Sequence, residues 1–423
     1  RQMLAIESYP VALVLTAISL ICWGSWGNTQ KGSQQPPLQY YLDFTVGLWI
    51  SSVLLVLLLG TDAVPCPSPS TSGCEGRSIF NDVTDAGRAK DIPLAFAAGV
   101  VFNFANLGLV LAISRVGLSV AMPLVVGTAM VLGTTLNFII DPSPVPGLIF
   151  PGIALGFCAV CAMAVAYKLK EDAKRVEAAS AAAPFITRDA LDAAPIVAAT
   201  GSASESESER AAYSSFASRG SSNGGDVEAA AAAARGRSDS SSSMSDAERA
   251  FAQSPMAGIL FSLALCLVSG ILMGLWSPMA TSAMTLLTPY TVHFWFTTAV
   301  LMTSLPITSI VGTSGIMGKR SNVCTYFNCR GKSLREVLDH LWGFAGGFIW
   351  TVGTLFNFVA GPTAGFAVSY AIGQSAPLCA AAWGVLVWRE FVGAPVLSWL
   401  FLWIMLVLYG GGIALIALSG RVD

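Results

Sequence analysis

Long apolar stretches without charge alternate with short polar segments along most of the chain. The hydrocarbon core of a bilayer is about 30 Å thick, and a helix needs about 20 mainly apolar residues to cross it. Ten stretches meet this length, and they cover residues 7–28, 42–60, 92–114, 118–140, 147–167, 255–278, 290–312, 341–361, 366–388 and 395–418. The pattern predicts an all-α integral membrane protein with ten transmembrane helices.

The composition agrees with a membrane location and argues against other classes. Hydrophobic residues make up 54% of the 423 positions and charged residues only 11%, whereas soluble domains carry about 25% charged residues. The formal net charge is −2, and no basic patch is interleaved with aromatic residues, so nucleic acid is not an expected partner. The partner that the composition predicts is the lipid bilayer.

Lysine and arginine indicate which side of the membrane each polar segment faces. They concentrate after the odd-numbered spans, for example at Lys31, Arg115 and Arg389 and within residues 168–175. Because cytoplasmic segments carry the excess of these residues, we expect the segments after odd-numbered spans in the cytoplasm. Both ends of the sequence should then face the opposite side.

A polar segment, residues 168–254, separates two groups of five spans. Ser, Ala and Gly dominate it, and such a composition cannot bury enough apolar surface to offset the entropy of ordering, so the loop should be disordered. Its role stays open between a plain tether and a regulatory segment, because "RGRSDSSSS" places serines beside arginines, where phosphorylation changes the local charge. The chain thus divides into a first five-helix repeat (1–167), a cytoplasmic loop (168–254) and a second five-helix repeat (255–423).

The two groups of spans resemble each other in sequence. "CWGSWGN" aligns with "LMGLWSP", which places Trp26 on Trp276. Residues 100–124 align with residues 348–372 at nearly the same spacing. Since each group has an odd number of spans, the second must enter the membrane from the opposite side. The sequence therefore predicts two inverted repeats, an architecture that places a solute site at the repeat interface near the membrane midplane.

A few carboxamide and tryptophan side chains interrupt the apolar spans. An unpaired polar group is costly in hydrocarbon, so each should face the bundle interior or a water-filled cavity. Hydrogen bonding between helices is the alternative for every one of them. Carboxamides both donate and accept, and tryptophan rings stack on flat solutes, so the combination suits a neutral, amide-like ring. The predicted substrate-binding residues are Trp23, Trp26, Asn103, Asn106, Asn137, Trp276 and Gln374.

Ionisable groups at membrane depth are rarer. Asp43 lies at the start of the second span, and His293 is the one histidine inside a predicted span. We predict that these two residues take part in proton coupling. The sequence contains no motif of a hydrolase, metalloenzyme or nucleotide-binding loop, so we expect no catalytic residues, metal ligands or cofactor.

Five stretches carry a family resemblance: "YLDFTVG", "GVVFNFANLGLVLAISRVGLSV", "GTTLNFIID", "IFPGIAL" and "QSAPLCAAAWGVLVWREF". They resemble the ureide permeases of plants, which belong to the drug/metabolite transporter superfamily. The resemblance implies ten spans and proton-coupled import of oxo-derivatives of nitrogen heterocycles, such as allantoin, uracil or xanthine-like solutes. It also favours a multi-pass protein of the plasma membrane over one of an endomembrane, and a homodimer stays open as an assembly state.

Two alternative functions remain at this point. Related porters in the same superfamily begin with similar "WGSW" segments, so a sugar or a nucleotide-sugar is an alternative solute. A non-transporting membrane receptor or scaffold, with the Ser-rich loop as its docking segment, is the alternative from another class. Solute uptake into liposomes separates transporters from scaffolds.

Overall fold

The computed structural model describes residues 6, 8–61, 78–116, 118–182, 255–314 and 334–420. By internal contacts the chain forms two units, of which the first comprises Arg1–Val176 with Gly258–Asp423 and the second Glu177–Ala257. The first unit holds the helical bundle. Most of the predicted loop, 168–254, lies outside the described residues, so its disorder stays a prediction.

The first half of the bundle contains the first five spans. Its elements are α1 (Tyr9–Ser25), α2 (Gly27–Gly32), α3 (Pro37–Leu59), the short helices α4 (Ile79–Thr84) and α5 (Ala86–Ala89), α6 (Ile92–Val116), α7 (Leu118–Met122), the π-helical turn η1 (Pro123–Gly127), α8 (Thr128–Ile140) and α9 (Pro146–Ala182). α1 and α2 together form the first span, and α7, η1 and α8 form the fourth.

The second half contains the remaining five spans. Its described elements are α14 (Pro255–Ala283), α15 (Pro289–Ser314), α17 (Leu334–Ala364), α18 (Phe366–Gln374), α19 (Ala376–Ala382), the π-helical turn η3 (Trp383–Val387) and α20 (Val396–Ser419). α18, α19 and η3 together form the ninth span.

The described residues contain ten helices that are long and apolar enough to cross a membrane, so the predicted all-α membrane fold is confirmed. The largest differences lie at two helix ends. α9 continues to Ala182 rather than ending at residue 167, and α17 begins at Leu334 rather than at residue 341. Both extensions are polar but rich in Leu, Lys, Arg, Glu and Ala, which favour helix without being apolar enough to predict a span.

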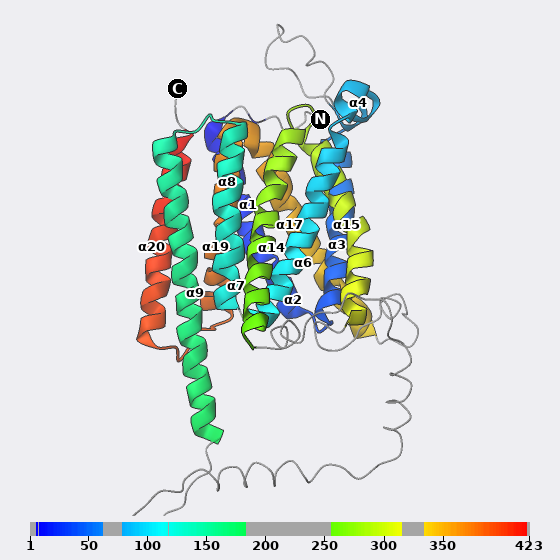
Figure 1. Cartoon of the computed structure of the whole chain (residues 1–423). Coiled ribbons are helices and arrows are strands. Elements are labelled where there is room, and N and C mark those ends of the chain that lie inside the picture. Colours follow the sequence, from blue (N-terminus) through cyan, green and yellow to red (C-terminus); the bar gives the residue numbers. More distant parts are fainter. Residues whose placement is uncertain are drawn as a thin grey trace, which may run out of the picture. The chain divides into compact units, whose positions relative to one another are not determined.

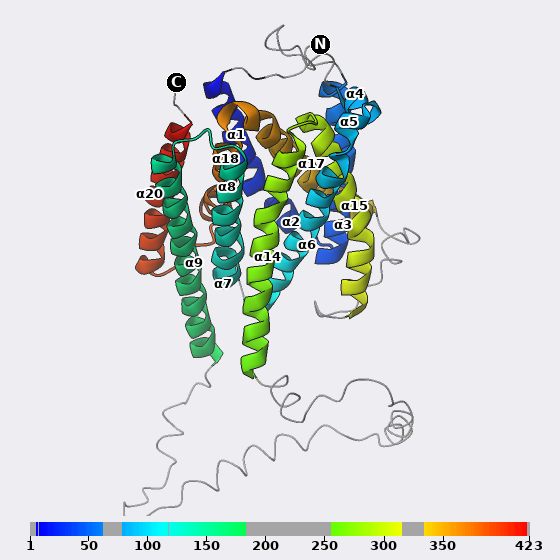
Figure 2. The same ribbon diagram turned by 45° about the horizontal axis from the view of Figure 1, so that its top comes forward.

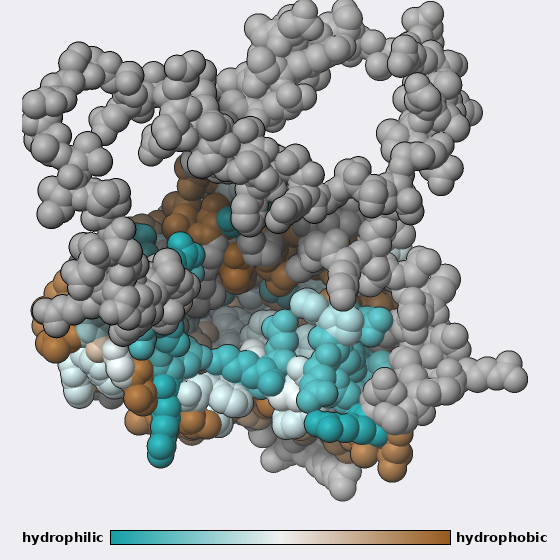
Figure 3. Space-filling model, turned by 90° about the horizontal axis from the view of Figure 1, so that it is seen from below, coloured by the Kyte–Doolittle hydropathy of each residue, from teal (hydrophilic) through white to brown (hydrophobic). Residues whose placement is uncertain are grey.

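The beginning of α1 and the end of α20 lie at the same end of the bundle, where the Tyr9 hydroxyl donates a hydrogen bond to the carbonyl of Ala417 (Figure 1). We call it the terminal end. The opposite end, at the bottom of Figure 1, carries Lys31, Arg115 and Lys170, and we call it the basic end. Seen from that side, hydrophilic residues gather on the surface of this end (Figure 3).

Glycines allow the central helices to pack closely. α3 lies along α17, where a Cβ at Gly47 would come within 2.5 Å of the Phe344 backbone and one at Gly347 within 2.3 Å of the Phe44 carbonyl oxygen. α6 packs against α15, and it also lies beside α14 (Figures 1 and 2). Small residues promote such contacts because helix association inside a membrane depends on close packing. These helices therefore pack closely against one another on one side of the bundle (Figure 1).

Two spans depart from a regular α-helix next to a proline, the fourth near its start and the ninth near its middle. In the fourth span, Pro123 begins the π-helical turn η1. In the ninth span, α18 ends at Gln374 and α19 begins at Ala376, with Pro377 directly after the break. Proline removes a backbone donor and clashes with the preceding turn, so it accounts for both interruptions.

Candidate functional site

A cavity of about 360 Å³ lies inside the bundle between the two halves of the chain. Residues from α1, α2, α6, α7, η1, α14, α17, α18 and α19 line it. Five of the seven predicted substrate-binding residues are among them, namely Trp23, Trp26, Asn106, Trp276 and Gln374. None of the lining residues is charged.

One side of the cavity is aromatic. The Trp23 ring stacks on Trp350 at a centroid distance of 6.2 Å and meets the edge of Trp276 at 6.0 Å. Its indole N–H donates to Thr354 Oγ1 at 3.0 Å, which fixes the ring. Phe102 packs on Trp350 at 4.8 Å. The rings present fixed apolar faces to whatever fills the cavity.

Sequence reasoning missed Trp350 and Phe102, although a signal for both was available. The alignment of residues 100–124 with residues 348–372 places Phe102 on Trp350, and the structure puts both in the cavity lining. A single aromatic residue in an apolar span is not distinctive by itself. A pair at matching positions of the two aligned segments is distinctive.

Asn106 reaches the cavity, whereas Asn103 lies behind it. The Asn103 side chain is fully buried, accepts a hydrogen bond from the Tyr41 hydroxyl at 2.6 Å and donates to Thr303 Oγ1 at 2.8 Å. Asn106 Nδ2 donates to the same Tyr41 hydroxyl at 3.3 Å. The two asparagines therefore belong to one network, in which only Asn106 lines the cavity.

The two remaining carboxamides occupy different environments. Gln374 ends α18 and lines the cavity, and no described residue hydrogen-bonds to its side chain. Asn137 lies outside the cavity lining and donates from Nδ2 to Ser277 Oγ at 3.0 Å, a contact between α8 and α14. Gln374 is thus free to bind a solute, while the Asn137 amide group joins two helices.

The structure does not bring Asp43 and His293 together. α3 and α15 run in opposite directions, so Asp43 lies towards the basic end and His293 towards the terminal end (Figure 1). His293 is fully buried, neither of its ring nitrogens has a hydrogen-bond partner among the described residues, and it packs against Phe358.

Asp43 instead pairs with His340, a residue that precedes the predicted eighth span. Asp43 Oδ2 lies 2.7 Å from His340 Nδ1, and the carboxylate is fully buried while the imidazole is 16% exposed. The pair joins α3 to α17, and a Cβ at Gly343 would collide with that of Asp43. Because α17 begins before the apolar stretch, its first turns bring a histidine to a buried carboxylate.

A cluster of charged residues lies at the basic end. Glu390 forms ion pairs with Lys31 and Lys170, and Trp388 Nε1 donates to Asn28 Oδ1 at 2.6 Å. Burial acts to raise the pKa of Glu390, but the hydrogen bond to Lys31 and the charge of Lys170 outweigh it, so this pKa is lowered. The cluster ties α2 and α9 to the connection between the ninth and tenth spans.

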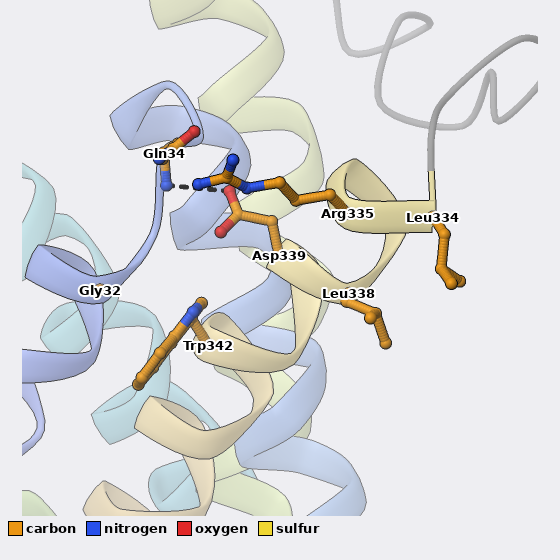
Figure 4. A pocket seen from close by; sticks show the side chains of 7 residues that line it. All are labelled: Gly32, Gln34, Leu334, Arg335, Leu338, Asp339 and Trp342. Carbon is orange, nitrogen blue, oxygen red and sulfur yellow. Dashed lines mark hydrogen bonds between the residues drawn. The ribbon is translucent and has the colours of Figure 1, made fainter.

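A second pocket of about 370 Å³ opens at the same end, between the connection from α2 to α3 and the first turns of α17 (Figure 4). The backbone N–H of Gln34 donates to Asp339 Oδ2 at 2.9 Å, and Arg335 and Trp342 complete the lining. It includes none of the predicted substrate-binding residues, and it lies at the end of the bundle rather than at membrane depth. The central cavity is therefore the candidate solute site.

Ten spans around a central cavity lined by aromatic and carboxamide side chains define a multi-pass membrane transport protein. The comparison with known families agrees: the ureide permease family model matches residues 40–419, and the chain belongs to that family. Ureide permease 1 of Arabidopsis thaliana is 24% identical over 99% of this chain and 100% of its own length. Ureide permease 2 and ureide permease 4 of the same plant are 22% and 24% identical, each over 99% of this chain.

Proposed function

We propose that this protein is a secondary active transporter that imports small neutral oxo-derivatives of nitrogen heterocycles, such as allantoin, uracil and xanthine-like solutes. The observation that carries the proposal is the joint lining of one cavity by Trp23, Trp276 and Trp350 with Asn106 and Gln374. A planar oxo-heterocycle needs aromatic faces for its ring and carboxamides for its C=O and N–H edges. The names of the relatives support ureides as the first solutes to test.

The cavity suits such a solute in size and charge. Its volume of about 360 Å³ falls within the range of about 300–1,000 Å³ that is typical of small-molecule sites. The lining offers no counter-charge, and an ion without a partner is disfavoured in an apolar interior. The proposed solute is therefore uncharged when it binds.

We also propose that the Asp43–His340 pair binds the coupling proton. A buried carboxylate next to a partly exposed imidazole can exchange a proton with the solvent and change the charge between α3 and α17. Further titratable side chains on the same two helices include Tyr40, whose hydroxyl bonds Thr29, Tyr41, which bonds Asn103, and Asp339, which accepts from the Gln34 N–H. His293 was the predicted second member, and neither of its ring nitrogens has a hydrogen-bond partner among the residues that the structure describes.

Uptake into proteoliposomes that contain the purified full-length chain tests these proposals. Radiolabelled allantoin is supplied with and without an imposed pH gradient, and unlabelled uracil, xanthine, glucose and a UDP-sugar compete for its uptake. We expect competition by uracil and xanthine, none by the sugars, and acceleration by an inward proton gradient. Competition by the sugars alone would favour the sugar transporter, and absence of uptake of every solute would favour a receptor or scaffold.

The same assay separates coupling from binding. Asp43→Asn should flatten the pH dependence of uptake more than it weakens solute binding, because the amide keeps a hydrogen-bonding group but cannot exchange the proton. An unchanged pH profile would remove Asp43 from the coupling mechanism. Surface labelling of the chain in its own cells tests the proposed plasma-membrane location.

A further inference from the structure

We infer that Asn106 presents its carbonyl oxygen to the central cavity in a fixed orientation, and that the cavity therefore selects solutes with an N–H group at the matching position. The inference rests on the proposed function, and it adds a specific requirement to it: an unsubstituted ring or ureido N–H rather than an N-alkyl group. The orientation of Asn106 is set by which group donates and which accepts in each hydrogen bond that links Thr303, Asn103, Tyr41 and Asn106.

The first hydrogen bond joins Asn103 to Thr303 on α15, and Thr303 accepts in it. Thr303 Oγ1 lies 2.7 Å from the carbonyl oxygen of Ala299, which can only accept, so the hydroxyl proton points there. The Thr303 oxygen is then an acceptor for Asn103 Nδ2 at 2.8 Å. The carbonyl of Val300 lies 3.4 Å from the same amide nitrogen. Asn103 therefore directs its NH₂ group at α15.

The second direction follows on α3. With its NH₂ group at α15, Asn103 has Oδ1 available as an acceptor, and the Tyr41 hydroxyl donates to it at 2.6 Å. Ser304 Oγ also approaches this oxygen, at 3.3 Å. A tyrosine hydroxyl has one proton, so after this bond its oxygen can only accept.

The third direction fixes Asn106. Its side chain meets the Tyr41 oxygen at 3.3 Å, and because that oxygen can only accept, the group that meets it is Nδ2. No described residue donates a hydrogen bond to Asn106 Oδ1, and this atom is not among the buried side-chain oxygens that lack a partner, whereas Asn137 Oδ1 is. The free oxygen belongs to a residue that lines the cavity.

The network of Asn103 and Tyr41 holds the Asn106 amide in this orientation because Asn103 and Tyr41 are buried. The exposed fractions of Asn103 and Tyr41 are 0% and 5%, so water does not compete for their bonds. Turning the Asn106 amide over would set two acceptors, its oxygen and that of Tyr41, against each other. Gln374 has no such restraint and can adapt to a solute donor or acceptor. Asn106 is therefore the residue that imposes the requirement.

The test measures binding of hydantoin, the ring of allantoin, and of its two mono-N-methyl derivatives to the purified full-length chain. For the unmodified chain we expect at least one methyl derivative to bind about threefold to tenfold more weakly than hydantoin, since one neutral hydrogen bond is lost. Tyr41→Phe keeps the ring that stacks on Phe44 but removes the hydroxyl. It frees the Asn106 amide to turn, so the ratio between hydantoin and that derivative should fall towards one.

The outcomes are distinguishable. If the unmodified chain binds hydantoin and both methyl derivatives equally well, the inference is wrong while the proposed function stands. An unchanged ratio in a folded Tyr41→Phe protein would also overturn it, because a structural role of the hydroxyl alone does not alter selectivity. If none of the three probes and no allantoin binds, the proposed function fails and this inference with it. Asn106→Leu should lower affinity for hydantoin and abolish the discrimination.

Discussion

The buried Asp43–His340 pair allows a quantitative test of how the bundle is held together. Replacing His340 by alanine removes the partner of a carboxylate that is fully enclosed between α3 and α17. Removing one partner of a buried charge pair typically costs about 3–5 kcal/mol.

A double-mutant cycle separates the pair from the two single effects. Asp43→Asn removes the charge and keeps the shape, so it should destabilise the protein less than His340→Ala does. The double variant carries no buried charge and should be more stable than His340→Ala alone. Unfolding in detergent micelles, followed by tryptophan fluorescence, provides the free energies. If the two single costs simply add, within about 0.5 kcal/mol, the residues are not coupled and the reasoning is refuted.

Three further predictions concern the cavity and the basic end. Gln374→Leu should raise the half-saturating solute concentration about threefold to tenfold at unchanged surface expression. The control variant Gln34→Leu changes a residue outside the central cavity and should leave this concentration unchanged. Equal kinetics for both variants would exclude Gln374 from solute binding. Trp23→Leu should weaken solute binding. Its matched control is Trp403→Leu, which changes a residue on α20 that is 63% exposed. Equal effects of the two variants on solute binding would mean that the Trp23 ring does not touch the solute. Glu390→Gln should lower the free energy of unfolding at neutral pH. This difference from the unmodified chain should vanish as the pH falls through the lowered pKa of Glu390, because the carboxylate is then protonated in the folded and the unfolded chain. A difference in stability that persists at low pH would contradict the ion-pair explanation.

The membrane spans could be predicted because the bilayer imposes a local requirement, a run of apolar residues of sufficient length. The site depends instead on which faces of different helices meet. Asn103 and Asn106 share one face of α6, yet the rotation of that helix against α3 places only the second in the cavity lining. Neither the apolar pattern nor the spacing of the two residues predicts how α6 is rotated against α3.

Helix packing also determines which histidine lies next to Asp43. The apolar pattern points to His293 because it lies inside a predicted span, whereas His340 precedes the predicted eighth span and carries no such signal. The structure pairs His340 with Asp43 because α17 starts early and packs closely on α3. Partner choice is set by helix packing across the bundle. A single sequence gives a hint of that packing only where two of its own segments align, as the segments with Phe102 and Trp350 do.

The break between α18 and α19 has a mechanical consequence. Around it, the Ser375 N–H bonds the carbonyl of Ile372 and the Leu378 N–H bonds that of Ser375, while Pro377 has no N–H to give. Bending a continuous helix would sacrifice backbone hydrogen bonds worth about 1 kcal/mol each, but here part of the regular pattern is already missing. The ninth span can therefore act as a hinge at Gln374, so that its two halves swing separately and the cavity between them changes shape at little energetic cost.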